Sequence, residues 1–232
     1  MDNFGIVIQA RMNSSRLPGK VLMEFCGKPM LLFQIDVLKR FNLGAKIVVA
    51  TTENPLDDDV EALCRNHGIP YLRGSEENVF HRFCRVAEQF EFDHIVRLTG
   101  DNPLPNYQII KTCMDEHCKR LPDLTSTRRI HPDHFVERYA PKGSSVDVIN
   151  SQTLLRIDRD RLDNFQREHV VPVFFDHSYE IALVKDFIFL EAVYTVDTAE
   201  NFESVSSYAQ SLIDRDCLLN ELGFVKTEKE SV

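Results

Sequence analysis

Short apolar runs alternate with helical stretches along the first half of the chain. Buried apolar runs predict strands at residues 4–10, 45–51, 69–72 and 94–99. Apolar positions at helical spacing and turn signals predict helices between and after them, at 30–41, 56–66, 76–90 and 106–119. Four strand–helix steps in a row predict an α/β fold, with a mostly parallel sheet covered by helices on both faces.

The second half of the chain follows a different pattern. Residues 121–138 are rich in Arg, His and Pro, which predicts a loop or short strands laid over a site. Strands are expected at 146–149 and 179–184 with a helical stretch between them, then a strand at 193–196 and a helix at 199–213. No repeat or linker is visible, so we predict a single domain over residues 1–232, with a lid or dimerisation segment at about 121–185.

The composition is that of an ordinary globular protein, with 43% hydrophobic and 27% charged residues. The longest apolar runs are far shorter than the ~20 residues that span a bilayer, so no membrane insertion is expected. The N-terminus has no basic region, which argues against a signal peptide and for a cytoplasmic protein. The six cysteines form no CxxC pair and are interpreted as reduced thiols rather than zinc ligands.

Charge is unevenly distributed along the chain. The net charge of −9 argues against nucleic acid as the main partner. Residues 1–48 nevertheless hold seven Lys or Arg against three Asp or Glu, so the rest of the chain carries −13. A basic beginning on an acidic protein indicates a local anionic ligand.

The loop after the first strand carries three cations, Arg11, Arg16 and Lys20. Arginine grips phosphate oxygens bidentately and lysine adds a mobile charge, so the loop suits a triphosphate. It is not a P-loop, because GxxxxGK[ST] is absent. A solvated basic loop is the alternative, and three cations in register after a buried strand favour the phosphate interpretation.

Two aspartates, Asp101 and Asp197, each follow a predicted strand. A carboxylate at the carboxyl edge of a sheet is a common Mg²⁺ ligand. Asp101 could instead be a turn residue before Asn102-Pro103, and Asp197 could be the N-cap of the helix at 199. From the residues alone, the cap is the first choice for Asp197.

An ordered set of motifs resembles the spore-coat polysaccharide (SpsF-like) cytidylyltransferases, relatives of the acylneuraminate and 3-deoxy-manno-octulosonate cytidylyltransferases. The motifs lie at residues 9–20, 27–30, 50–58, 73–75, 97–104, 167–170 and 195–198. The resemblance implies a Rossmann-like nucleotidyltransferase (GT-A-like) sheet. It implies an Mg²⁺-dependent homodimer that moves CMP from CTP to an acidic sugar or similar small-molecule acceptor, for surface polysaccharide biosynthesis, and releases pyrophosphate.

The resemblance also implies the site residues. It makes Asp101 and Asp197 the metal ligands and, with Arg11 and Lys20, the catalytic set. Its nucleotide-binding residues are Ala10, Arg11, Arg16, Lys20, Thr51, Thr52, Arg73, Ser75 and Thr99. Its acceptor-binding residues are Arg167, His169 and Asp147.

Several of these roles have a structural alternative. Ser75 could simply cap the next helix. Asp59 suits the first turn of a helix, where acidic residues favour the dipole, while Asp57 and Asp58 stay open. Relatives often read Gly-Leu-Asp-Val-Glu where this chain has residues 143–147 with Ser145 and Asp147, which leaves open an acceptor different from theirs.

Three other functions remain to be weighed. A glycosyltransferase of similar architecture would consume a nucleotide sugar, but the triphosphate loop argues against it. A CTP-dependent enzyme could act on a sugar phosphate or polyol phosphate. A nucleotide-binding regulator without activity is the third, and the retained aspartates and cations argue against it. The sequence names neither the acceptor nor a general base.

Overall fold

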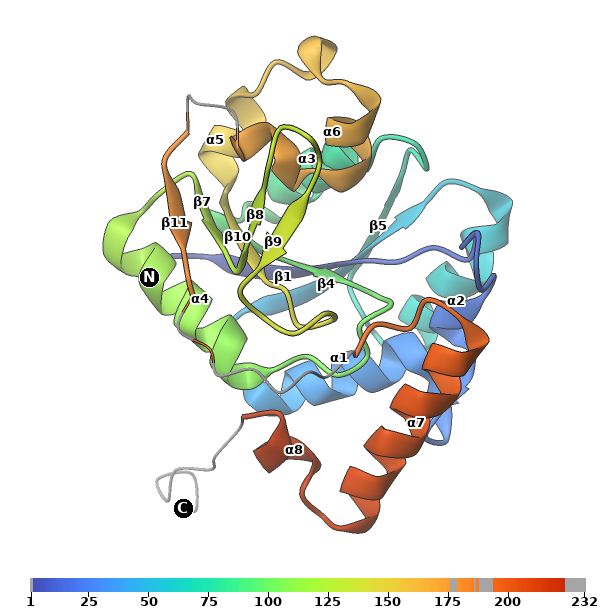
Figure 1. Cartoon of the computed structure of the whole chain (residues 1–232). Coiled ribbons are helices and arrows are strands. Elements are labelled where there is room, and N and C mark those ends of the chain that lie inside the picture. Colours follow the sequence, from blue (N-terminus) through green and yellow to red (C-terminus); the bar gives the residue numbers. More distant parts are fainter. Residues whose placement is uncertain (1, 176–178, 186, 188–193, 224–232) are drawn as a thin grey trace.

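The computed structural model of the chain describes residues 2–175, 179–185, 187 and 194–223. Its centre is a seven-stranded sheet in the order β11-β7-β10-β6-β1-β4-β5 (Figure 1). The strands are β1 (Phe4–Gln9), β4 (Lys46–Thr52), β5 (Tyr71–Gly74), β6 (His94–Thr99), β7 (Leu124–Ser126), β10 (Asp147–Asn150) and β11 (Ile181–Leu183). Among the described strands of this sheet only β10 pairs antiparallel with its neighbours, so the expected mostly parallel α/β sheet is confirmed.

Successive side chains of the central strands point to opposite faces of the sheet, which divides the hydrophobic core into two halves. On β1, Ile6 and Ile8 face one side of the sheet and Val7 faces the other, and all three are fully buried. Because successive side chains of a strand point to opposite faces, a continuous apolar run supplies both halves at once. The strand is therefore covered by helices on both faces.

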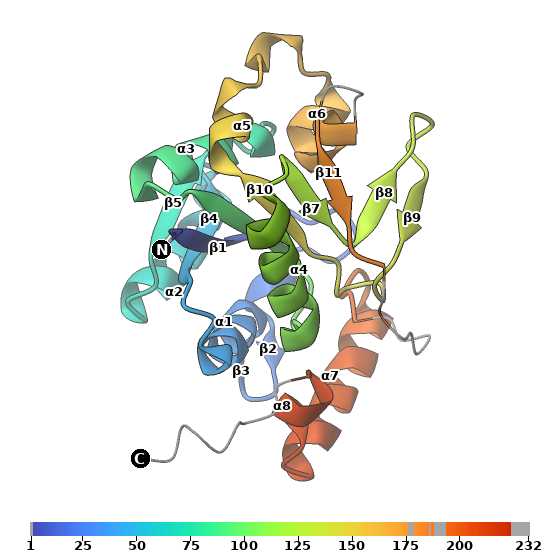
Figure 2. The same cartoon turned by 90° about the vertical axis from the view of Figure 1, so that its left-hand side faces the viewer.

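In the described part of the chain, helices cover both faces of the sheet, in two groups (Figures 1 and 2). The first group is α1 (Met30–Phe41), α2 (Asp58–Asn66), α4 (Tyr107–Arg120), α7 (Ala199–Asp214) and α8 (Leu218–Glu221). The second is α3 (Val79–Phe90), α5 (Ser151–Arg156) and α6 (Asn164–His169). In the described part of the chain, every helix is too short or too polar to cross a membrane.

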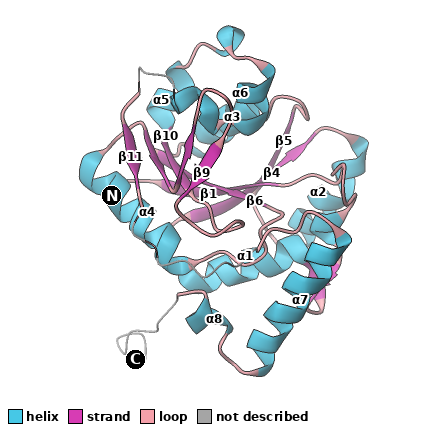
Figure 3. Cartoon of the chain, in the orientation of Figure 1, coloured by secondary structure: helices cyan, strands magenta, loops and turns pink. Residues whose placement is uncertain are grey.

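Short elements complete the fold (Figure 3). Two-stranded ribbons pair β2 (Glu24–Phe25) with β3 (Lys28–Pro29), and β8 (Arg128–Ile130) with β9 (Val136–Arg138). Single 3-10 turns are η1 (Lys20–Leu22), η2 (Pro55–Asp57), η3 (Arg159–Arg161) and η4 (Val171–Phe175). The short strands expected within residues 121–138 are confirmed.

The segment at 121–185 does more than was expected of a lid. It supplies β7, β10 and β11 to the central sheet, so it completes the main fold. It also supplies α6, which packs beside α3 (Figure 2). The segment is therefore part of the same core as the first half of the chain.

Some expected boundaries were wrong. Helix α3 begins at Val79 rather than at 76, because Asn78 is its N-cap and accepts the His81 N–H at 2.9 Å. Strand β5 lies two residues later than expected. Of the strand expected at 193–196, residue 193 lies outside the described residues and the other three form no strand. Tyr194 and Val196 instead donate single backbone hydrogen bonds to Lys142 and Asp101.

Candidate active site

A cleft of about 360 Å³ lies at the carboxyl ends of β1 and β6. Its walls are the loop after β1, the first turn of α3, the end of α6 and residue 197. Parallel α/β sheets bind their ligands at this edge. Of the residues predicted for the site, the cleft contains Ala10, Arg11, Arg16, Lys20, Thr99, Asp101, His169 and Asp197.

The basic loop has a defined shape. The Met12 carbonyl accepts the N–H groups of Ser14 at 2.9 Å and of Gly19 at 2.8 Å, which folds the loop back on itself. Gly19 has φ of +76°, a left-handed conformation that glycine adopts without strain, and the chain enters η1 directly after it. The turn carries Lys20 into the protein, where its side chain is only 8% exposed.

Asp57 anchors the loop from outside. Its buried carboxylate accepts the Met12 N–H at 2.6 Å and also the hydroxyl of Thr52. Asp57 therefore has a structural role that ties the end of β4 to the basic loop. Asp58 pairs with Arg73 instead, and Asp59 lies in the first turn of α2 as expected.

Lys20 joins the two aspartates. Its Nζ lies 3.2 Å from Asp101 Oδ2 and 3.7 Å from Asp197 Oδ1, and donates to the Val196 carbonyl at 2.6 Å. The two carboxylates are thus no farther apart than the sum of these two distances. They lie at the same sheet edge, although almost a hundred residues separate them in the sequence.

Asp197 lies among cations rather than at a helix end. Arg16 Nη2 is 2.8 Å from its Oδ1 and Lys142 Nζ is 3.3 Å from its Oδ2. The N-cap of α7 is Thr198, whose hydroxyl accepts the Asn201 N–H at 3.2 Å. The cap interpretation of Asp197 is therefore wrong, since its neighbour performs that task.

Asp101 is held from its own strand. The Thr99 hydroxyl donates to Asp101 Oδ1 at 2.6 Å, and the Asp101 carbonyl accepts the Val196 N–H at 2.8 Å. The side chain of Asp101 is 30% exposed, more than that of Asp197, so part of its carboxylate faces the open cleft. In the described residues no group of three or more His, Cys, Asp or Glu is arranged to hold a metal ion, so any metal here would rest on two carboxylates.

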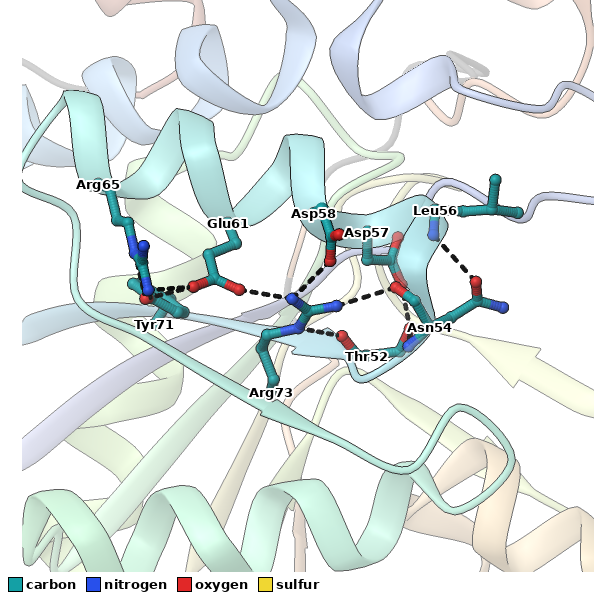
Figure 4. Close-up of polar contacts among 9 residues, drawn as sticks. All are labelled: Thr52, Asn54, Leu56, Asp57, Asp58, Glu61, Arg65, Tyr71 and Arg73. Atoms are coloured by element: carbon teal, nitrogen blue, oxygen red, sulfur yellow. Dashed lines mark hydrogen bonds and ion pairs between the residues drawn. The ribbon is translucent and has the colours of Figure 1, made fainter.

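Arg73 lies outside the cleft, in a network of its own (Figure 4). Its nitrogens donate to the carbonyls of Thr52 and Asn54 at 2.7 and 2.9 Å. They also donate to the carboxylates of Asp58 at 2.7 Å and Glu61 at 2.5 Å. The predicted nucleotide residue Arg73 therefore braces the β4–α2 junction. The buried Thr51 and Thr52 do not line the cleft either.

A second cavity of about 550 Å³ adjoins the cleft and shares Arg11 and Glu168 with it. It contains two more of the predicted residues, Ser75 and Arg167. Ser75 does not cap α3, but its hydroxyl accepts the Asn78 N–H at 3.1 Å and so shapes the turn before the helix. The nucleotide and acceptor residues predicted at 75 and 167 are thus brought to one place.

His169 enters the cleft at a strained point of the backbone. It is the last residue of α6, and Val170 after it has φ of +65° and ψ of −57°. A β-branched residue is sterically disfavoured in this region, and such strain persists only where the surroundings enforce it. Partial desolvation lowers the pKa of His169, so the imidazole is neutral near pH 7.

The inner part of the cleft contains two arginines that sequence reasoning missed, Arg82 and Arg97. Both are almost completely buried, at 2% and 6% exposure. The signal that could have found them was an arginine inside an apolar pattern, at Arg82 among the apolar positions of α3 and at Arg97 within β6. Such a residue needs a buried partner or a ligand.

Asp147, predicted at the acceptor, lies behind Arg97 and is not part of the cleft lining. Its carboxylate accepts Arg97 Nη1 at 3.2 Å, Arg128 Nη2 at 2.5 Å and the Ser126 hydroxyl at 2.7 Å. Burial alone would raise the pKa of Asp147, but the Arg128 and Arg97 guanidinium groups outweigh it and hold the pKa below its ordinary value. Asp147 is therefore an ionised counter-charge for two arginines.

The family assignment follows from comparison with known proteins. Residues 5–228 match the family model described as cytidylyltransferase. The chain belongs to the cytidylyltransferase family. It is 31% identical to the spore coat polysaccharide biosynthesis protein SpsF of Bacillus subtilis, over the full length of both chains. It is 36% identical to the 3-deoxy-manno-octulosonate cytidylyltransferase of Colwellia psychrerythraea, over 70% of this chain and 62% of that one.

Solved structures agree on the fold. A cytidylyltransferase from Leptospira borgpetersenii matches with a TM-score of 0.80 and 24% identity, covering 98% of this chain and all of that one. A CMP:2-keto-3-deoxy-manno-octonic acid synthetase complexed with CTP matches with a TM-score of 0.67 and 18% identity, covering 90% and 99%. Rv0371c of Mycobacterium tuberculosis, in complex with manganese, has a TM-score of 0.57 at 14% identity, covering 89% and 99%. The nucleotidyltransferase fold expected from the sequence is thereby confirmed.

Proposed function

We propose that this cytidylyltransferase moves CMP from CTP to an acidic sugar and releases pyrophosphate, in the biosynthesis of a surface polysaccharide. The observation that carries the proposal is the contact of Lys20 with both Asp101 and Asp197, inside a cleft walled by the basic loop. Among the relatives, SpsF is named for spore-coat polysaccharide biosynthesis, and the Colwellia enzyme for an acidic sugar.

The cations of the loop would bind and orient the triphosphate. Arg11 and Arg16 are 41% and 62% exposed, and their present partners are Glu76 at 3.8 Å and Asp197 at 2.8 Å. Both guanidinium groups are reached by solvent although Asp197 is mostly buried, so both arginines can exchange these carboxylates for phosphate oxygens. Bidentate contacts to phosphate are charge-assisted and stronger.

The reaction needs positioning more than covalent help from the protein. An acceptor hydroxyl oxygen forms a bond to the α-phosphorus, the bond from the α-phosphorus to the bridging oxygen breaks, and the hydroxyl proton is released. Pyrophosphate leaves with the bonding electron pair, and Arg11, Arg16 and Lys20 stabilise the charge that develops on it.

Mg²⁺ suits the two aspartates. The ion takes one or two carboxylates and completes its shell with phosphate oxygens and waters, and the donor set here is two carboxylates at an open sheet edge. Asp101 and Asp197 would hold it. When bound, the ion supplies charge neutralisation at the phosphates. The part-exposed carboxylate of Asp101 fits this role, because it is turned toward the open cleft.

Other substrates and functions fit less well. A sugar phosphate or polyol phosphate acceptor would use the same cleft and is the first alternative. A glycosyltransferase would require a nucleotide sugar in place of a triphosphate, and three loop cations are more than a diphosphate needs. A regulator without activity would have no reason to keep the contact of Lys20 with both aspartates.

The quaternary structure and location follow as further proposals. We infer a single-domain, cytoplasmic homodimer whose contacts come from the segment at about 121–185. An apolar side chain in that segment, Phe135, is 61% exposed at the end of the β8–β9 ribbon. Sedimentation of the wild-type protein and of Phe135→Ser tests this, since a dimer held by this surface dissociates in the variant. Nucleic acid and membranes are not expected partners of a chain with net charge −9.

The decisive experiment for the function is a screen of acceptors for CTP-dependent pyrophosphate release. Nonulosonic acids, 3-deoxy-manno-octulosonate, sugar phosphates and polyol phosphates are incubated with CTP, Mg²⁺ and the protein. We expect release with an acidic sugar and none without an acceptor. Release only from a phosphorylated acceptor selects the alternative, and no release with any acceptor contradicts the proposed function.

A further inference from the structure

The inner end of the cleft holds two buried guanidinium groups that the proposed triphosphate site does not use. Arg82 comes from α3 and Arg97 from β6, and both line the cleft together with Gln9 and His169. The Nε atoms of both arginines are fully buried and have no hydrogen-bond partner among the residues that the structure describes. Within the same described part of the chain, the buried Oε1 of Gln9 has no hydrogen-bond partner either.

Unpaired donors of this kind call for a ligand. A buried donor without a partner costs about 1–3 kcal/mol, and more when it is charged, so native proteins rarely retain one without use. Arg82 donates through Nη1 to the Ser75 carbonyl at 2.8 Å. In the described part of the chain Arg82 has no ion pair, and Arg97 has only the one to Asp147.

The local charge is therefore positive. Asp147 is shared between Arg97 and Arg128, so one carboxylate faces two guanidinium groups, and Arg82 adds another positive charge to the cleft wall. Burial, with a smaller contribution from neighbouring arginines, lowers the pKa of both Arg82 and Arg97 to about 10. A bound anion would offset the free-energy cost of burying these positive charges.

The position of Arg97 separates this charge from the triphosphate cations. Arg97 lies two residues before Thr99, the last residue of β6, and a strand advances about 3.3 Å per residue, so its backbone is roughly 7 Å behind the strand end that leads to Asp101. An acceptor whose hydroxyl attacks an α-phosphate near Asp101 would turn its anionic group toward the inner wall, where Arg82 and Arg97 line the cleft.

We propose that Arg82 and Arg97 form an anion-binding subsite for the negatively charged group of the acceptor, a carboxylate or a phosphate. Two planar guanidinium groups match the oxygens of either anion. Asp147 positions Arg97 from behind, and Gln9 Oε1 accepts a hydroxyl of the same molecule. This subsite rests on the proposed function for its occupant, and explains why a buried Asp147 is retained beside the cleft without lining it.

The test measures binding rather than turnover. Wild-type protein is first titrated by calorimetry with the α,β-methylene analogue of CTP in Mg²⁺, which cannot be turned over. The loaded protein is then titrated with N-acetylneuraminate as a carboxylate probe and with glycerol 3-phosphate as a phosphate probe. The same series is run on Arg82→Gln and Arg97→Gln. The control is Arg40→Gln, which removes an exposed arginine at the end of α1.

We expect wild-type and control proteins to bind at least one probe, and each site variant to bind it at least tenfold more weakly. Affinity for the CTP analogue should change less than threefold. The probe that binds identifies the anionic group. Arg82→Gln keeps the test valid if Arg97→Gln folds poorly, since among the described residues Arg82 has no ion pair to lose and gives up the hydrogen bond to the Ser75 carbonyl.

Three results would overturn the subsite: no binding of either probe to wild-type protein, unchanged probe affinity in both variants, or a larger loss of affinity for the CTP analogue than for the probe. The last result would place the arginines at the nucleotide. Failure of the CTP analogue to bind wild-type protein refutes the proposed function instead. In that case, titration of the probes into nucleotide-free protein still tests the subsite by the same criteria.

Discussion

The basic loop and Arg73 were predicted to bind the same nucleotide, but their arginine side chains differ in solvent exposure and in the hydrogen bonds that they make within the protein. Arg11 and Arg16 are exposed and have weak or replaceable partners. Arg73 makes four hydrogen bonds inside the protein, two of them to carboxylates (Figure 4). A guanidinium group whose donors are already bonded has little left for a ligand. The comparison favours Arg11 and Arg16 over Arg73 as ligand-binding residues, because their donors are the ones left accessible to a ligand.

The largest loss of turnover is expected when either of the two cleft aspartates beside the basic loop is replaced. Asp101→Asn and Asp197→Asn should each lower turnover on the order of a hundredfold or more, because each removes charge that would hold the metal and its phosphates. Pyrophosphate release at saturating CTP measures this. Asp115→Asn, at an exposed ion pair on α4, is the control and should keep full activity. Turnover within threefold of wild type in both variants contradicts the shared metal site.

The next largest loss of activity is expected when a cation of the basic loop is removed. Lys20→Ala and Arg11→Ala each remove a charge-assisted contact worth roughly 1.5–3 kcal/mol, which corresponds to about ten- to a hundredfold in activity. Their stability should differ. Lys20 is buried between two carboxylates, so its loss lowers the melting temperature, whereas loss of the exposed Arg11 leaves it unchanged. Full activity in both variants would mean that the loop is merely solvated.

The variant Arg73→Met tests whether Arg73 stabilises the fold instead of binding the nucleotide. We expect a loss of stability of about 1–3 kcal/mol, because Glu61 and the Thr52 and Asn54 carbonyls lose a partner, with kcat and the KM for CTP nearly unchanged. Denaturant unfolding and steady-state kinetics measure the two effects. Arg65→Met, at a more exposed arginine beside the same Glu61, is the matched control with a smaller effect. A tenfold rise in KM without loss of stability would restore Arg73 to the nucleotide.

The smallest expected effect is a change of protein stability with pH, and it arises at His117, away from the basic loop and from Arg73. His117 is completely buried against His94 and Thr125, at 3.1 and 2.9 Å, and burial lowers its pKa to about 3. The unfolded chain binds this proton near pH 6.5 and the folded chain does not, so stability is complete above that pH and falls below it. We expect a loss of about 1 kcal/mol between pH 7 and pH 5.5.

Unfolding of the wild type and of His117→Asn across this range tests the assignment. The slope of stability against pH should flatten in the variant. An identical slope would assign the acid sensitivity to charged groups elsewhere, including those of the cleft.

Local signals explain what the sequence could predict. Apolar runs located β1 and β6, and the rule that parallel strands share a ligand edge brought Arg16, Lys20, Asp101 and Asp197 together correctly. Helix α1 has the expected bounds, because its apolar spacing is regular over its whole length.

The predictions that differ from the structure involve contacts between residues distant in the sequence, or the distinction between two adjacent residues. Helix α7 begins at Ala199 as expected, but its cap is Thr198, directly before it, and not Asp197 one residue earlier. Arg73 and Asp147 carry the expected charges, but their partners on other elements turn them away from the cleft. The short strands β7 and β11 join the main sheet through β10, and such pairing is not visible in local patterns.

The central claim is that the cleft beside the basic loop binds CTP. Calorimetric titration of the protein with CTP, ATP, GTP and UTP in Mg²⁺, repeated with Lys20→Ala, tests it most directly. We expect CTP to bind at least tenfold more tightly than the other three, and Lys20→Ala to weaken CTP binding by a similar factor. Equal affinity for a purine triphosphate would contradict the cytidine specificity, and unchanged CTP affinity in Lys20→Ala would contradict the location of the site.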